Sequence, residues 1–260
     1  MSVKTPHVLR NYTGYARELL TYSTYYIRPK HNPETKFVIF TVGRTGSNLL
    51  VSLLNSHPEI TCHGELLYKK VAYPQLYIRC KEKLVRQNVF GFKLLLYNFG
   101  VQNIFDPRPI LDDMVIDGYK IINLKRRNLL RQTISHMLAL YRKTFHQERG
   151  DAQLFHNQMI VDFSFFQEEL ELFIDHRRRE EELLKDFSYL RLDYEDDLLP
   201  EKNHQVTVDK IAQYLGIPTA SVISDFGKTT PQDLSNVIEN YEEFTEYLEG
   251  MNYSHYLNED

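Results

Sequence analysis

The 260-residue sequence lacks what several protein classes require. Its two cysteines, Cys62 and Cys80, are too few for a disulfide framework or a zinc site. No apolar run approaches the roughly 18 residues of a membrane span, and polar or aromatic residues interrupt any signal-peptide core near the N-terminus. A net charge of −4 argues against a general nucleic-acid-binding protein, which usually has a basic domain. We therefore expect a cytoplasmic protein with reduced thiols and neither a membrane span nor a nucleic-acid partner.

The composition is that of a globular protein. Hydrophobic residues make up 42 % of the chain and charged residues 25 %. The first 35 residues are rich in tyrosine, and we interpret residues 1–35 as an N-terminal arm with one short helix near residues 16–25. Residues 36–260 then form the main domain, since this length is typical of one α/β domain.

Apolar segments of two kinds alternate along the main domain. Short apolar or alternating runs predict strands, and segments with helical spacing of apolar residues follow them. Strands alternating with helices indicate an α/β fold with a central, mostly parallel sheet flanked by helices. The predicted strands are residues 37–42, 89–97, 119–124 and 189–194, and the helices include residues 128–141.

A glycine-containing loop, residues 43–48, joins the first strand to a helix. The backbone N–H groups of such a turn and the positive end of the helix favour a phosphate-like anion. Arg44 and the hydroxyls of Thr45 and Ser47 supply further donors. The alternative is an ordinary turn that needs glycine for its backbone angles. A Walker A loop would have lysine where Gly46 stands, which argues against an ATPase or nucleotide kinase.

A basic cluster, residues 125–127, ends the third strand. Three cations at the start of a helix oppose the helix dipole, so we expect a bound anion to compensate them. Arg127 and the later Ser135 would share one phosphate only if the strand end folds back beside the helix. The alternative is a solvated basic helix start. A second run, residues 177–179, is interpreted as a solvated helix face.

Two segments carry a resemblance to a known family. GRTGSNLLVSLLNSHPEITCHGEL and INLKRRNLLRQTIS resemble the sulfotransferases that use 3′-phosphoadenosine 5′-phosphosulfate (PAPS). The resemblance extends over roughly residues 36–235 and is closest to the bacterial carbohydrate (nodulation-factor-like) and tyrosylprotein branches. It implies a P-loop-like sulfotransferase fold. Two residues of the loop differ from the usual family sequence. Many members have lysine at the position of Arg44, and the arginine here follows the tyrosylprotein pattern. The usual residue at the position of Asn48 is threonine.

The resemblance also implies which residues hold the nucleotide. The loop would bind the 5′-phosphosulfate and the basic cluster the 3′-phosphate. Tyr194, in the segment LDYED, would contact adenine or belong to the core. Lys228 would close over the nucleotide or lie in a polar linker. The predicted nucleotide contacts are Arg44, Thr45, Gly46, Ser47, Asn48, Arg127, Ser135, Tyr194 and Lys228.

Sulfuryl transfer requires positive charge around the moving group and a base for the acceptor hydroxyl. Arg44 supplies charge because a guanidinium stays protonated. The branches that the sequence resembles have a catalytic glutamate in a Gly-Glu context like that of Glu65, which is therefore the expected base. In this sequence His63 is the rival base and His57 a weaker one. Lys93, inside an apolar strand, is interpreted as a second cation at the reacting centre, or as a lysine that reaches water at the sheet edge.

The acceptor is predicted only by class. We expect a hydroxyl of a carbohydrate or glycolipid, because a peptide tyrosine would need a lumenal protein. No metal is expected. The alternatives are a nucleotide-binding protein of the same fold without catalysis and a P-loop-type kinase, and the sequence leaves the oligomeric state open.

Overall fold

The computed structural model of the chain describes residues 7–142, 158–224, 233–251 and 253. Its centre is a five-stranded sheet in the order β2-β3-β1-β4-β5, in which every neighbouring pair is parallel. The predicted α/β fold with a parallel central sheet is therefore confirmed. The strands are β1 (Thr35–Thr41), β2 (Ile60–Glu65), β3 (Val89–Leu95), β4 (Tyr119–Lys125) and β5 (Tyr189–Asp193).

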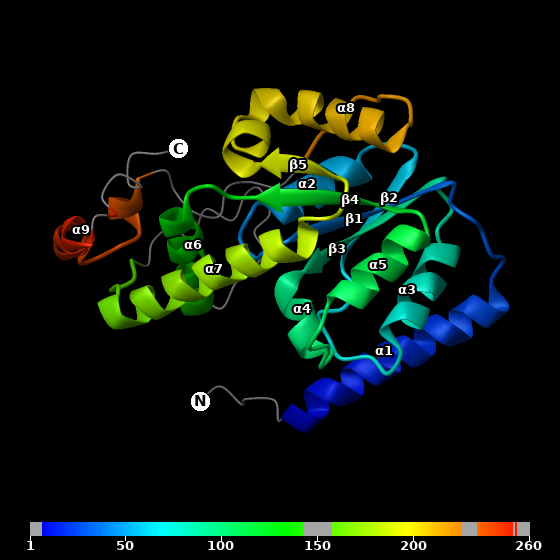
Figure 1. The fold of residues 1–260 in the computed structure, drawn as a ribbon, viewed down its shortest axis with the longest axis horizontal. Coiled ribbons are helices and arrows are strands. Elements are labelled where there is room, and N and C mark those ends of the chain that lie inside the picture. The colour runs from blue at the N-terminus through cyan, green and yellow to red at the C-terminus, as the bar shows by residue number, and fades with distance from the viewer. Residues whose placement is uncertain (1–6, 143–157, 225–232, 252, 254–260) are drawn as a thin grey trace.

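Helices cover both faces of the sheet (Figure 1). Apolar side chains of α2 (Ser47–Asn55) and α8 (His204–Leu215) pack on one face. Those of α3 (Pro74–Lys83), α4 (Leu96–Val101) and α5 (Arg108–Ile116) pack on the other. A further core joins α6 (Leu129–Arg142), α7 (Phe163–Leu184) and α9 (Tyr241–Gly250).

The strand alternation explains how one sheet serves two cores. Along β1, Phe37 and Ile39 belong to the core under α2 and α8, whereas Val38 and Phe40 belong to the core under α3–α5. All four side chains are fully buried. Successive side chains of a strand point to opposite faces, so a continuous apolar run is what a strand covered on both sides requires.

Four local features differ from the sequence prediction. The strand predicted over residues 89–97 ends at Leu95, because Leu96 begins α4. The segment after α2 forms a full strand, β2, that continues to Glu65. Helix α1 (His7–Ile27) is longer than the predicted residues 16–25 and packs against α3. The last strand ends at Asp193, because Tyr194 begins a π-helical turn, Tyr194–Leu198. Alternation of apolar residues did not mark this exit, since Tyr194 continues the pattern of Leu190 and Leu192.

The centre of the sheet contains a close contact between Gly91 and a phenylalanine ring. Gly91 on β3 is paired with Phe37 on β1, and a Cβ added at Gly91 would lie 2.1 Å from the edge of the Phe37 ring. The ring thus fills the space of a missing side chain in a buried strand. Glycine is required here for this close approach and not for its backbone angles.

We expect Gly91→Ala to destabilise the protein by about 1–3 kcal/mol, because the added methyl group overpacks the core against Phe37. Gly100→Ala is the matched control: Gly100 lies in α4 with nothing within 4 Å of an added Cβ. That substitution should be neutral or stabilise by up to about 1 kcal/mol. Urea unfolding of both variants measures the difference, and a Gly91→Ala protein as stable as the control would contradict this packing.

Candidate functional site

The loop after β1 is held in an unusual backbone conformation. Arg44 has φ 66° and Gly46 has φ 80°, both in the left-handed region. The Thr45 hydroxyl is buried, 2.8 Å from the Thr41 hydroxyl and 3.2 Å from the carbonyl oxygen of Val42. A non-glycine residue at positive φ is uncommon and is often found at functional sites. The loop turns at the N-terminus of α2, as an anion-binding loop should.

Tyr194 closes one side of this loop. A Cβ added at Gly46 would lie 2.5 Å from the Tyr194 ring, so only glycine leaves room for it. The Arg126 guanidinium lies over the same ring, 4.8 Å from its centroid. The structure therefore brings the predicted residues Gly46 and Tyr194 together, although Tyr194 lies in a turn and not in a strand.

Arg44 connects the loop to α6. Its Nε and Nη2 atoms donate to the Ser135 hydroxyl at 3.1 and 2.9 Å. From α6, Gln132 donates to the carbonyl oxygen of Gly43 at 2.6 Å. Burial, followed by the charge of Arg126, lowers the pKa of Arg44 to about 10. Arg44 therefore remains a cation at neutral pH, as the sequence analysis expected of a guanidinium.

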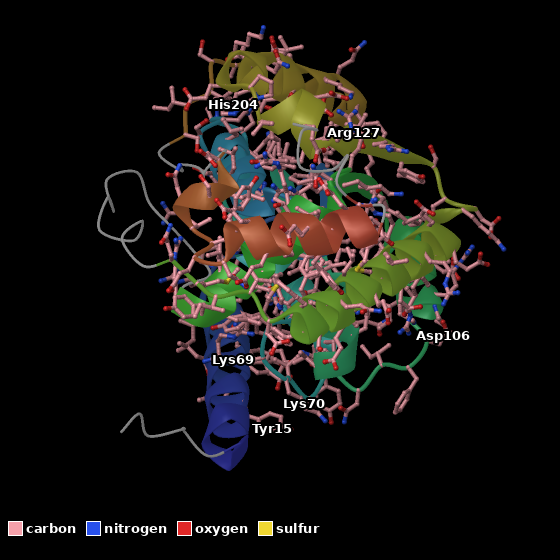
Figure 2. The ribbon with its side chains drawn as sticks, turned by 90° about the vertical axis from the view of Figure 1, so that its left-hand side faces the viewer. Tyr15, Lys69, Lys70, Asp106, Arg127 and His204 are labelled. Atoms are coloured by element: carbon pink, nitrogen blue, oxygen red, sulfur yellow. The ribbon has the colours of Figure 1, made fainter. Side chains whose placement is uncertain are left out.

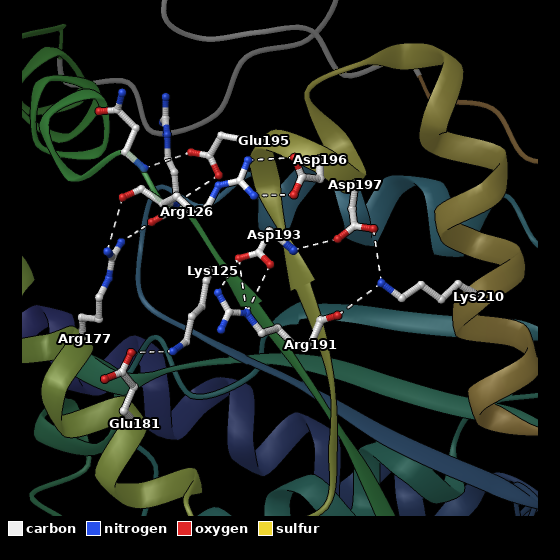
Figure 3. Close-up of polar contacts among 12 residues, drawn as sticks. Lys125, Arg126, Arg177, Glu181, Arg191, Asp193, Glu195, Asp196, Asp197 and Lys210 are labelled. Carbon is white, nitrogen blue, oxygen red and sulfur yellow. Dashed lines mark hydrogen bonds and ion pairs between the residues drawn. The ribbon is translucent and has the colours of Figure 1, made fainter. Parts of the chain in front are cut away.

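The basic cluster has an anionic partner within the chain (Figure 3). The Glu195 carboxylate is buried and accepts hydrogen bonds from the backbone N–H groups of Arg127 and Asn128, at 2.9 and 3.1 Å. Asn128 in turn caps α6 by accepting from the N–H of Arg131 at 2.8 Å. A protein carboxylate thus compensates the positive helix start, which the sequence analysis had assigned to a bound anion.

Arg127 itself forms a forked ion pair with Asp196. Both terminal nitrogens of Arg127 reach the two carboxylate oxygens, the Nη2–Oδ1 distance being 2.7 Å. The two side chains are 47 % and 62 % exposed, so the pair is open to exchange with another anion. Ser135 contacts Arg44 in this structure, so Arg127 and Ser135, the two residues predicted to share one phosphate, have different partners here.

The prediction of a solvated helix face at residues 177–179 is wrong for Arg177. Arg177 on α7 is half-buried and donates hydrogen bonds to the carbonyl oxygens of Arg126 and Arg127, whereas Arg178 and Arg179 are exposed. One turn later, Glu180 is buried near Lys125, and burial raises its pKa to about 7. Charged runs are commonly solvated, and nothing in the local sequence marks Arg177 as the residue that faces inward.

The second half of the site is a buried ion pair. Lys93 is 3 % exposed, and its Nζ atom lies 3.1 Å from Glu65 Oε1 and 2.5 Å from Asn48 Oδ1. Glu65 Oε2 accepts from the hydroxyl of Tyr97 and, at 3.4 Å, from Asn98. Burial lowers the pKa of the Lys93 ammonium, and the Glu65 carboxylate partly offsets that effect.

This arrangement excludes one interpretation of Lys93 and links three predicted residues. β3 lies between β2 and β1, so Lys93 is not at a sheet edge and does not reach water there. Asn48, the residue that departs from the family pattern, contributes an amide oxygen to Lys93 where a threonine would offer a hydroxyl. Asn98, at the start of α4, was not identified from the sequence, because an asparagine after a strand carries no distinctive spacing.

A β-bulge separates the two candidate bases. The register shifts between His63, paired with Phe92, and Glu65, paired with Lys93. Neighbouring residues of a strand face opposite sides, so Glu65 shares the face of Lys93 and His63 the opposite face. The His63 ring lies 5.8 Å from the Phe90 ring, and burial, with Lys81 nearby, lowers its pKa to about 4.

His57, the weaker candidate base, forms hydrogen bonds with backbone groups. His57 is buried, with Nε2 3.0 Å from the carbonyl oxygen of Pro218 and Nδ1 accepting from the N–H of Glu59. It therefore joins the end of α2 to the segment after α8.

Lys228 lies outside the described residues. Within the described ranges, no three His, Cys, Asp or Glu side chains cluster as a metal site would require.

No family model matches the chain. A search of curated proteins finds no match either. Among solved structures, the chain is similar to a sulfotransferase from Alicyclobacillus acidocaldarius, with 14 % identity, a TM-score of 0.48, and 88 % of this chain and 97 % of that chain covered. It is also similar to mouse sulfotransferase SULT7A1 in complex with PAP, with 18 % identity, a TM-score of 0.44, and coverage of 80 % and 67 %.

We expect Glu195→Ala to destabilise the protein by about 1–3 kcal/mol, because it leaves two backbone N–H groups at the start of α6 without their acceptor. Asp196→Ala, one residue along, removes only the exposed pair with Arg127 and should cost less than about 1 kcal/mol. Both values come from urea unfolding. Equal losses in the two variants would show that Glu195 does not hold this end of α6.

Proposed function

We propose that the protein is a PAPS-dependent sulfotransferase that moves the sulfuryl group to an acceptor hydroxyl. The observation that carries the proposal is the position of the buried Lys93–Glu65 pair beside the loop at the N-terminus of α2. An anion-binding loop would hold the donor, and a carboxylate in contact with the same lysine would meet the acceptor. The resemblance of the loop and of the basic cluster to the PAPS-using family gives the donor its chemical identity.

The reaction assigns a role to each charged group. The acceptor oxygen attacks sulfur in line with the bridging oxygen of the donor, the sulfur–oxygen bond to the 5′-phosphate breaks, and that phosphate leaves with the electron pair. Arg44 and Lys93 stabilise the negative charge of the peripheral and leaving oxygens. Glu65 accepts the hydroxyl proton. Tyr97 and Asn98 orient the carboxylate, and Tyr97 remains a donor because burial and the bond to Glu65 raise its pKa.

The nucleotide half of the site would use the residues after β4 and β5. The 3′-phosphate would replace the Asp196 carboxylate on Arg127, since both anions accept a forked pair of hydrogen bonds. Adenine would lie near Tyr194, which packs on Gly46. Ser135 would contact the nucleotide at the phosphate beside Arg44, since its hydroxyl accepts hydrogen bonds from Arg44.

The acceptor in this proposal is a carbohydrate or glycolipid hydroxyl, and the protein acts in the cytoplasm. Supporting this class is Tyr97, which is 46 % exposed while its hydroxyl contacts Glu65. A tyrosine ring open to solvent beside the base offers a surface on which a sugar ring can pack.

The nucleotide half predicts preferential binding of 3′-phosphoadenosine 5′-phosphate (PAP) over AMP in calorimetric titration without magnesium. Arg127→Ala should weaken PAP binding at least about tenfold, since hydrogen bonds to charged groups are lost, and leave AMP binding unchanged. Arg191→Ala is the control, because Arg191, on the neighbouring strand β5, is also an exposed arginine paired with an aspartate, Asp193. Asp196→Asn should strengthen PAP binding. Equal affinity for PAP and AMP would contradict the assignment of the 3′-phosphate.

The catalytic half predicts the effect of Glu65→Gln. The amide retains the size of the side chain but accepts no proton, so sulfuryl transfer should slow by about 10²–10⁴-fold while PAP affinity stays the same. Transfer of labelled sulfate from PAPS to a screened set of sugars and glycolipids measures the rate. His63→Gln should stay within a few-fold of the parent protein. A fully active Glu65→Gln enzyme would remove Glu65 as the base.

A further inference from the structure

Helix α1 has its polar and apolar sides reversed. Within residues 14–27 of this helix, the charged residues Arg17 and Glu18 face the protein and the large apolar residues face outward. A surface helix of a globular protein normally shows the opposite pattern, with an apolar stripe toward the core. Such an arrangement indicates a surface that is covered by something else.

The inward contacts fix the orientation of the helix. Glu18 is 4 % exposed and accepts from the backbone N–H groups of Ala72 and Tyr73, at 2.7 and 3.0 Å. Arg17 donates to the carbonyl oxygen of Leu66 at 2.7 Å, with its guanidinium 4.4 Å from the centre of the Tyr68 ring. These bonds use buried charged groups, so α1 cannot rotate its apolar side inward without breaking them.

The outward face of α1 is apolar over residues 15–27. At 100° per residue, the exposed positions fall on one side, and Ser23 is the only polar residue among the exposed positions from 15 to 27. Tyr73 and Leu76, 65 % and 48 % exposed, lie at the start of α3, the helix against which α1 packs. The large apolar residues of α1 on this face are Tyr15 (42 % exposed), Leu19 and Leu20 (67 % each), Tyr26 (80 %) and Ile27 (82 %).

Cations lie at both ends of this face. Arg28 and Lys30 are exposed just beyond the C-terminal end of α1. At the other end, Gly14 packs against the backbone of Lys70, and Figure 2 shows Lys69 and Lys70 near Tyr15. Glu18 is the single acidic residue in the described part of α1, and it is buried. Two copies joined through this face would bring like charges together, whereas an anionic surface would be attracted.

We propose that this outward face of α1 binds the surface of a membrane that contains anionic lipids. The helix would lie in the headgroup region, with its leucines and isoleucine among the acyl chains and the flanking cations on lipid phosphates. Its tyrosines suit the boundary between apolar and wet regions. None of the described helices has the length and apolar character of a membrane-spanning segment, so the contact is with the surface. The inference does not rest on the proposed catalytic function.

The test is sedimentation of the full chain with vesicles of phosphatidylcholine and phosphatidylglycerol (7:3). The protein should bind these vesicles, bind pure phosphatidylcholine less, and dissociate at high salt as the cations are screened. The double variant Leu20→Glu with Ile27→Glu should bind at least about tenfold more weakly, because it places two charges in the apolar face. The matched control is Phe105→Glu with Ile116→Glu, which changes two residues that are 91 % and 81 % exposed elsewhere.

The proposal would be overturned if the parent protein did not bind vesicles. It would also be overturned if the control double variant lost vesicle binding as much as Leu20→Glu with Ile27→Glu does. The proposal would also be overturned if the parent protein did not bind vesicles but formed a dimer in light scattering that Leu20→Glu with Ile27→Glu dissociates. A second copy of the chain would then cover the face. A second measurement does not depend on the folding of the charged variant. An environment-sensitive fluorophore on Ile27→Cys should shift to the blue with anionic vesicles, and the same label on Phe105→Cys should not. No shift at position 27 would contradict membrane contact.

Discussion

The buried ammonium group of Lys93 is the feature on which the arrangement of the site depends. A charge in the middle of a sheet is tolerated only with hydrogen-bonded partners, and removal of one partner of a buried pair typically costs about 3–5 kcal/mol. The partners are Glu65 from β2 and Asn48 from the first turn of α2. The bulge before Glu65 brings its carboxylate onto the face of Lys93. One buried cation thus links the start of α2 to the Glu65 carboxylate.

The parallel sheet explains why these groups meet. All five strands end at one edge, where α/β proteins commonly bind ligands. Along that edge, β2 and β3 supply the Glu65–Lys93 pair, β1 supplies the loop with Arg44, and β4 and β5 supply the basic cluster and Tyr194. In the proposed reaction the acceptor would lie over β2 and β3, and the nucleotide over β4 and β5. The sulfuryl group would pass between them beside Arg44.

The sequence predicted the sheet and the segments of the site better than the contacts within them. Apolar runs located β1, β3 and β4 because these strands are covered on both faces, whereas alternating apolar residues located β5. The partner of the basic cluster was missed, since Glu195 comes from a strand end 68 positions after Arg127. The Asn48–Lys93 contact was also missed, because an amide oxygen 45 positions away leaves no local pattern. Long-range polar pairs of this kind become visible only when the strand order is known.

A crystal structure with PAP bound would test the account most directly. The account predicts the 5′-phosphate on the backbone N–H groups of the loop and beside Arg44. It also predicts that Arg127 has moved from Asp196 to the 3′-phosphate, and that the Lys93–Glu65 pair faces the space next to the 5′-phosphate. PAP bound away from the loop, or an Arg127–Asp196 pair still intact beneath the nucleotide, would contradict it.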